Sequence, residues 1–318
     1  MQEYIRMPYA GINTFLGSPL IDDLDKIKDG EIIILGVPYD MGTTYRSGAR
    51  FGPNAIRSAS SLYTYHKSSL SNTTMKESGM QNLWDINKKN YVLKDAKVYD
   101  VGDVSIIPAN PLKSFDNITE SAKKIINKKA FPVFLGGDHS ITYPILRAFS
   151  NYENIHIIHF DTHIDTWENV GQAELGHGSP LFLAQKLHHI KTITHIGLHG
   201  FLNDEDRYAE ATQKGHHIIT ASDVFSNNFN LSKILPNNDM YYITFDIDVF
   251  DPAYAPGTGT PESGGLSPMQ VFNLLEIICQ NRKFIGMDLV EVSPPYDFAN
   301  ITALLATHTI ITFLEFIM

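Results

Sequence analysis

The sequence predicts an α/β protein, a three-layer α/β/α sandwich around a mostly parallel sheet of about eight strands. Short apolar runs rich in β-branched residues recur along the chain, and segments with helical periodicity separate them. The runs are apolar on both faces, as strands are when helices cover both sides of a parallel sheet. The expected strands are Glu31–Val37, Lys97–Gly102, Phe131–Leu135, Ile155–Phe160, Thr192–Leu198, His216–Ile219, Tyr241–Ile247 and Phe284–Val290.

Helical patterns fill the intervals between these strands. The clearest are around Ser114–Lys128, Asp204–Lys214, Ser267–Gln280 and Ile301–Phe316. The third has a defined start, because Ser267 can cap it, Pro268 suits the first helical position and Gln270 completes a capping box. The polar, turn-rich segment Lys67–Asn90 is interpreted as an insertion. With no internal repeat in the sequence, we expect a single domain over residues 1–318.

Composition excludes several classes of protein. The 318 residues are 43% hydrophobic and 19% charged, and no run of about 18 apolar residues suggests a membrane span, so we expect a soluble chain. The net charge of −10 argues against nucleic acid as a partner and fits cationic partners. The N-terminus lacks the pattern of a signal peptide, and the single Cys279 fits a reducing compartment. We therefore expect a cytoplasmic location.

Acids and histidines follow three of the expected strands. In open α/β sheets, ligands bind beyond the carboxyl ends of the strands. Residues two apart in an extended chain point the same way, so Asp161, His163 and Asp165 share one face, as do Asp246 and Asp248. The six candidate ligands are His139, Asp161, His163, Asp165, Asp246 and Asp248.

This concentration of charge indicates a metal centre. Four buried carboxylates would each lose hydration and repel their neighbours, so a cation must lie between them. Mixed carboxylate and imidazole ligands favour Mn²⁺, Fe²⁺, Zn²⁺ or Ni²⁺ over Ca²⁺. Six ligands are too many for one catalytic ion that keeps an open position, so we expect two. An Asp-x-Asp or an Asp-x-His-x-Asp motif alone is more often a helix cap or a turn, but here both motifs follow apolar strands. In addition, Gly136-Gly137 allows the close backbone approach that a crowded site needs.

The motifs resemble the signatures of the arginase/agmatinase ureohydrolase family. Three match in order: Gly136-Gly137-Asp138-His139-Ser140, Asp161-Thr162-His163-Ile164-Asp165 and Thr244–Pro252. Further similarity covers about Gly36 to Asp297. The resemblance implies that Asp161 and Asp246 bridge two Mn²⁺ ions, with Ni²⁺ or another divalent metal as an alternative. His139 and Asp165 would complete one site, and His163 and Asp248 the other. A hydroxide shared by the ions would then attack a guanidino carbon and release urea and an amine.

The resemblance also implies two catalytic residues. Glu291 would pair with the guanidinium, although it could be an ordinary acid at a strand end. His177 would carry a proton to the leaving amine as an imidazole that is neutral near pH 7, although it could be a surface-loop histidine. Asp138 is expected to shape a turn rather than bind metal. The remaining histidines, His159 and His195 among them, are expected to be core or surface residues. Relatives often carry Ala in place of Thr162 and Arg in place of His199, so these departures put pocket details in doubt.

The substrate is predicted from the loop after the second metal motif. Arginases carry an Asn-rich and Ser-rich loop there, which Thr166–Glu174 does not match, so arginine is disfavoured. Glu168 or Glu174 could face the cationic tail of agmatine, whereas Arg46 or Arg50 could face a carboxylate tail. Agmatine is the first expectation and 4-guanidinobutyrate the second. Guanidinopropionase, guanidine hydrolase, a deacylase relative and a catalytically silent metal-binding protein stay open. Family members usually form trimers or hexamers, so a homo-oligomer is expected.

Overall fold

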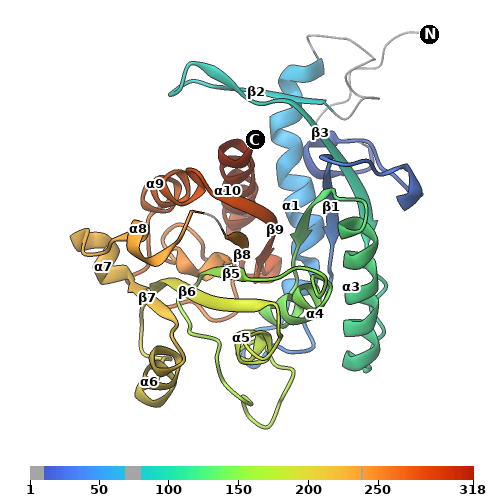
Figure 1. The fold of residues 1–318 in the computed structure, drawn as a ribbon. Helices are drawn as coiled ribbons and strands as arrows, with labels where there is room; N and C mark the ends of the chain where they lie inside the picture. Colours follow the sequence, from blue (N-terminus) through green and yellow to red (C-terminus); the bar gives the residue numbers. More distant parts are fainter. Residues whose placement is uncertain (1–10, 69–79, 238) are drawn as a thin grey trace.

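The computed structural model describes residues 11–68, 80–237 and 239–318, and its centre is one twisted sheet (Figure 1). Nine strands in these residues follow the order β2-β3-β1-β4-β9-β8-β5-β6-β7, parallel throughout except for the β2–β3 pair. The strands are β1 Ile32–Gly36, β2 Met80–Asp85, β3 Asn90–Asp103, β4 Phe131–Leu135, β5 Ile155–Phe160, β6 Ile190–Leu198, β7 His217–Thr220, β8 Met240–Asp246 and β9 Lys283–Val290.

The sheet departs from the prediction at one edge. The expected insertion Lys67–Asn90 contains strand β2, so the predicted number of about eight strands is one too low; residues 69–79 lie outside the described part. β3 also begins at Asn90, seven residues before the predicted start, and its first half pairs with β2 as an antiparallel ribbon. Val92, Leu93 and Ala96 of the ribbon are buried in the core that includes α10, but polar and charged residues stand between them, so the segment lacks the continuous apolar run by which strands were recognised.

Helices pack on both faces of the sheet and give the predicted three layers. In β1, Ile32 and Ile34 belong to a core that includes α1, α9 and α10, whereas Ile33 and Leu35 belong to a second core with α3, α4 and α5. Successive side chains of a strand point to opposite faces, so one strand supplies both cores. The helices are α1 Gly52–Ser60, α3 Pro111–Ile126, α4 Thr142–Arg147, α5 Pro180–Ala184, α6 Glu205–Gln213, α7 Ala221–Ser226, α8 Leu231–Ile234, α9 Pro268–Cys279 and α10 Ile301–Ile317.

Two helices test the sequence predictions directly. Helix α9 begins with the predicted capping box, in which Ser267 and Gln270 bond each other's backbone N–H groups. Residues Phe298–Ile317, which include α10, are long and apolar enough to cross a membrane by length and composition, contrary to the expectation that no such segment exists. Because 56% of that window is buried inside the fold, α10 is placed as a core helix beside α1 and α9 (Figure 1).

A buried ion pair connects α1 to the sheet. Arg57 of α1 donates two hydrogen bonds to the carboxylate of Asp100 in β3, at 2.8 and 2.9 Å. It also donates to Asp103 Oδ1 at 2.6 Å. Both Arg57 and Asp100 are buried. A paired guanidinium and carboxylate of this kind hold the helix in a fixed position on the sheet.

Candidate metal centre

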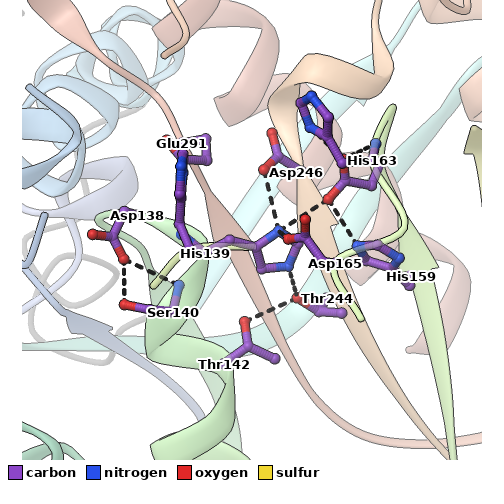
Figure 2. Close-up of polar contacts among 12 residues, drawn as sticks. Asp138, His139, Ser140, Thr142, His159, His163, Asp165, Thr244, Asp246 and Glu291 are labelled. Atoms are coloured by element: carbon purple, nitrogen blue, oxygen red, sulfur yellow. Dashed lines mark hydrogen bonds and ion pairs between the residues drawn. The ribbon is translucent and has the colours of Figure 1, made fainter. Parts of the chain in front are cut away.

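The candidate ligands converge because the strands that carry them are neighbours. Strands β4, β9, β8 and β5 lie next to one another, and all four are parallel, so their carboxyl ends meet at one edge. His139 follows β4, Asp161 follows β5, Asp246 ends β8 and Glu291 follows β9. Figure 2 shows His139, Asp165 and Asp246 lying close to one another at this edge. The predicted position of the site, beyond the strand ends, is therefore confirmed.

One group of ligands surrounds Nδ1 of His139. This atom lies 3.0 Å from Asp161 Oδ2, 3.1 Å from Asp165 Oδ2 and 3.2 Å from Asp246 Oδ2 (Figure 2). Three carboxylates around one imidazole nitrogen form a mixed nitrogen and oxygen donor set, which suits a divalent transition metal.

A second group surrounds Nδ1 of His163. That atom lies 3.3 Å from Asp161 Oδ1 and 3.2 Å from Asp248 Oδ2. Asp161 therefore directs one oxygen to each group, as a bridging carboxylate must. Asp246 contacts the first group through Oδ2, while its Oδ1 accepts from the backbone N–H of Asp248 at 2.9 Å. Its own bridging role stays a prediction.

The electrostatics of the cluster fit bound cations. Burial, together with the charges of Asp248 and Asp161, raises the pKa of Asp246 well above its usual range. Burial and the charge of Asp161 raise the pKa of Asp248 to about 6. Nδ1 of His139 and Oδ2 of Asp248 are buried and make no hydrogen bond within the described part of the chain. Cations between these atoms would offset the repulsion and satisfy both orphaned atoms.

A tight turn after β4 places His139. A Cβ atom on Gly137 would lie 1.7 Å from the carbonyl oxygen of Tyr39, so only glycine fits there. Asp138 accepts hydrogen bonds from the N–H groups of Gly42 at 2.7 Å and Ser140 at 3.0 Å. Asp138 thus holds the turn and lies outside both ligand groups, as the sequence predicted.

Two residues that support the ligands were missed from the sequence. His159, expected to be an ordinary histidine, places Nε2 2.8 Å from Asp161 Oδ2 (Figure 2). Thr244 Oγ1 lies 2.8 Å from His139 Nε2 and donates to Asp288 Oδ1 at 2.6 Å. The available signal was spacing, because His159 and Thr244 each stand two residues before a ligand on the same face of a strand.

The two predicted catalytic residues contact each other. His177 Nδ1 lies 2.9 Å from Glu291 Oε1, which also accepts from the backbone N–H of His139 at 3.0 Å. Burial alone would lower the pKa of His177, but the charge and hydrogen bond of Glu291 raise it to about 9. With this pKa the metal-free chain carries a charged His177 ring near pH 7, in place of the neutral ring that was expected. The other oxygen, Glu291 Oε2, is buried and has no hydrogen-bond partner among the residues that the structure describes.

Thr44 is a further residue that the sequence did not indicate. Its hydroxyl lies 2.8 Å from His177 Nε2, and its backbone N–H lies 3.2 Å from the same atom. The hydroxyl can accept a proton from an imidazolium and can donate to a neutral imidazole. The backbone contact favours the neutral form, whereas Glu291 favours the charged one. The His177 ring is thus held in place while its outer nitrogen can gain and lose a proton.

Comparisons with known proteins agree with this geometry. The model of the arginase family matches residues 30–315. This chain belongs to the arginase family. It is 37% identical over 290 residues to the mitochondrial guanidino acid hydrolase of Homo sapiens, covering 86% of this chain and 74% of that protein. It is 33% identical over 320 residues to the mitochondrial agmatinase of Gallus gallus, covering 96% and 85%. The structure of proclavaminate amidino hydrolase from Streptomyces clavuligerus is 30% identical, covers 98% of each chain and has a TM-score of 0.83.

Membership decides the class of reaction. The chain is a hydrolase acting on the linear amidine C–N bonds of guanidino compounds, and the His/Asp cluster is its binuclear metal site. The fold, the ligand cluster and the family all support the prediction made from the motifs.

The residues that were predicted to contact the substrate tail are not part of the metal-ligand cluster of this arginase-family chain. Glu168 and Glu174 are exposed, and Arg50 is ion-paired with Asp40. Arg46 is half-buried, donates through Nε to the carbonyl oxygen of Gly259 at 3.0 Å, and makes no ion pair among the described residues.

The two departures from the family pattern also have defined places. Thr162 is buried and donates its hydroxyl to the carbonyl oxygen of His199 at 3.1 Å. The ring of His199 contacts the carbonyl oxygens of Gly197 at 2.7 Å and Glu262 at 3.1 Å. These contacts join two loops beside the metal cluster, and the backbone N–H of Thr162 also donates to the ligand Asp248 at Oδ1, at 3.2 Å.

Proposed function

We propose that this chain hydrolyses agmatine, or a closely similar guanidino compound, to urea and an amine with two Mn²⁺ ions. The observation that carries the proposal is the buried, unpaired Oε2 of Glu291 beside the metal cluster. A guanidinium presents N–H donors in a fixed plane, and a carboxylate accepts them with strong charge-assisted hydrogen bonds. Ni²⁺ or another divalent transition metal fits the same donor set.

The chain's own residues orient the substrate and move its proton. Glu291 would hold the guanidinium through Oε2 and keep His177 oriented through Oε1. His177, protonated at neutral pH, would give a proton to the leaving amine nitrogen and regain one through Thr44. When bound, the two cations supply positive charge that lowers the pKa of water toward neutrality. His139, Asp161 and the other four ligands would hold these cations.

Support for agmatine comes from the acidic chain and from the likeness to an agmatinase. The net charge is −10, and the exposed Glu174 stands three residues before His177. A cationic tail would meet a favourable field at such an entrance. The relative named agmatinase matches 96% of this chain.

A second candidate, 4-guanidinobutyrate, is favoured by Arg46. Gly259, whose carbonyl oxygen accepts from Arg46, lies against Glu291, because a Cβ atom on Gly259 would be 3.4 Å from Glu291 Oε2. A half-buried guanidinium so close to the proposed substrate position could receive a carboxylate tail. The relative named guanidino acid hydrolase, at 37% identity, is consistent with this alternative.

Matched variants separate the two substrates. Urea release would be measured for agmatine, 4-guanidinobutyrate, 3-guanidinopropionate, arginine and guanidine, first with Mn²⁺ and then with Ni²⁺. If agmatine is the substrate, its kcat/KM should exceed that of 4-guanidinobutyrate by about tenfold or more, or ~1.4 kcal/mol. Glu174→Gln should then reduce the preference, while Arg46→Gln should not. The opposite pattern would establish a carboxylate-tailed substrate, and no urea from any compound would refute the proposed reaction.

We also propose that the chain is cytoplasmic and forms a homo-oligomer, a trimer or hexamer. The single cysteine supports the first proposal, and the family resemblance supports the second. Light scattering after size-exclusion chromatography measures the oligomer directly, and a monomer at micromolar concentration would contradict it. Fractionation of the source cells tests the location.

A further inference from the structure

Three buried imidazoles form a hydrogen-bonded chain across strands β5, β6 and β7. His159 of β5 and His195 of β6 are paired in register, and their Nδ1 atoms lie 2.8 Å apart. His195 Nε2 lies 3.1 Å from Nδ1 of His216, the residue before β7. At the inner end, His159 Nε2 lies 2.8 Å from Asp161 Oδ2. The chain thus leads across three strands to the carboxylate shared by both ligand groups.

The inner end determines which atoms donate. An ionised carboxylate only accepts, so His159 Nε2 must donate to Asp161. The 2.8 Å contact between the Nδ1 atoms of His159 and His195 needs one donor and one acceptor, so one of these nitrogens carries no proton. A neutral imidazole donates at one nitrogen and accepts at the other. His159 Nδ1 therefore accepts from His195, and His195 Nε2 accepts from His216. Each ring fixes the tautomer of the next.

His195 and His216, the two outer rings, are suited to fixing the tautomer of His159. Burial lowers the pKa of His195 well below its usual range, and burial with the charge of Lys214 lowers the pKa of His216 to about 4. Both rings are therefore neutral at physiological pH, and neither adds charge to the metal centre. Packing alone does not require imidazoles here. An apolar side chain could fill the place of His195 but would leave His159 Nδ1 buried without a partner.

We propose that His195 and His216 are positioning residues for the metal centre. By fixing the tautomer and ring orientation of His159, they hold the Asp161 carboxylate with one oxygen toward each ligand group. Partners of this kind commonly determine how tightly a metal is held. The inference rests on the proposed two-metal function and assigns the retention of the metals to residues beyond the ligands.

The test compares two substitutions at one position. His195→Leu fills the space without a hydrogen bond, whereas His195→Gln can both donate and accept. Each protein is loaded with Mn²⁺ and mixed with excess chelator, and the release of Mn²⁺ is followed in time. We expect His195→Leu to release metal about 10- to 100-fold faster than the unsubstituted protein. His195→Gln should release it at close to the original rate.

Controls separate positioning from general damage. His189, buried and bonded to the carbonyl oxygen of Leu146 at 2.9 Å, lies outside the chain. His189→Leu should therefore retain metal normally. Melting temperatures of the metal-free proteins report any loss of packing. If His195→Leu fails to fold, His216→Phe replaces the outermost ring, which lines a surface pocket of about 300 Å³, and should also speed release.

The outcomes are distinct. Faster release from His195→Leu, with recovery in His195→Gln and no change in His189→Leu, supports the proposal. Equal release rates from the Leu and Gln variants, or rates that follow the metal-free melting temperatures, overturn it. An unsubstituted protein that retains no Mn²⁺ would instead refute the metal centre itself, and with it this inference.

Discussion

Replacing Glu291 with Gln is expected to lower the pKa of His177 from about 9 to its ordinary value near 6.5 or below. The two side chains meet at 2.9 Å in a buried site, where a charge acts strongly. Gln keeps the size of Glu291 and can still accept a hydrogen bond, but it removes the negative charge that opposes the effect of burial. At pH 7.5 the imidazolium fraction should fall roughly tenfold.

The measurement is an NMR titration of the His177 ring in metal-free protein, with and without Glu291→Gln. The kinetic counterpart is the dependence of kcat/KM on pH. Because an imidazolium donates the proton, activity should fall as pH rises through the pKa of His177, near 9 in the unsubstituted protein. His177→Asn should lose this decrease at high pH and be slower by about 10²–10⁴-fold, or ~3–5 kcal/mol of activation free energy.

The free energy of unfolding should also fall as pH rises. A pKa raised by folding means that protonated His177 stabilises the folded chain. This contribution is complete below about pH 6.5 and is lost as pH rises through about 9. A His177 pKa that stays near 9 in Glu291→Gln would show that another group raises it. Unchanged turnover in His177→Asn would return His177 to the role of an ordinary loop residue.

Three further results are expected. Asp161→Asn should lower the metal content to one ion or none and abolish urea formation, because Asp161 directs one oxygen to the ligand group of His139 and the other to that of His163. Two tightly held ions in this variant, measured by elemental analysis, would contradict the ligand assignment. Gly137→Ala should destabilise the fold or displace the turn, since its Cβ would lie 1.7 Å from the oxygen of Tyr39, and an unchanged melting temperature would count against this. Arg57→Met should cost about 3–5 kcal/mol of unfolding free energy, because it leaves the buried Asp100 carboxylate with backbone N–H donors and without its cation. A denaturation midpoint equal to the original would show that the pair contributes little.

The parts of the fold that carry the site could be predicted from sequence. Strands β4 and β5 have the predicted bounds, because both are apolar runs that end abruptly in the ligand motifs. The β2–β3 ribbon was not predicted, because its buried residues Val92, Leu93 and Ala96 are separated by Lys94 and Asp95 and form no continuous apolar run. The six candidate ligands could be proposed from sequence because metal binding requires acids and imidazoles at fixed spacing.

The supporting residues were harder to find because their roles depend on contacts between distant segments. His195 and His216 are ordinary in sequence, and only the order β5-β6-β7 joins them to His159. Thr44 reaches His177 across 133 positions. The charge state of His177 also had to come from the structure, because a resemblance identifies a residue without giving the environment that sets its pKa.

The arrangement of ligands over four adjacent strands has a consequence for how the protein matures. His139 and Asp248 are 109 positions apart in the chain (248 − 139), and the strands that bring them together include β9, one of the last elements to be synthesised. A growing or partly folded chain therefore cannot assemble the complete set of donors, and contacts this distant form late. The complete site should therefore form only after β8 and β9 have joined the sheet, so binding of both ions would report finished folding.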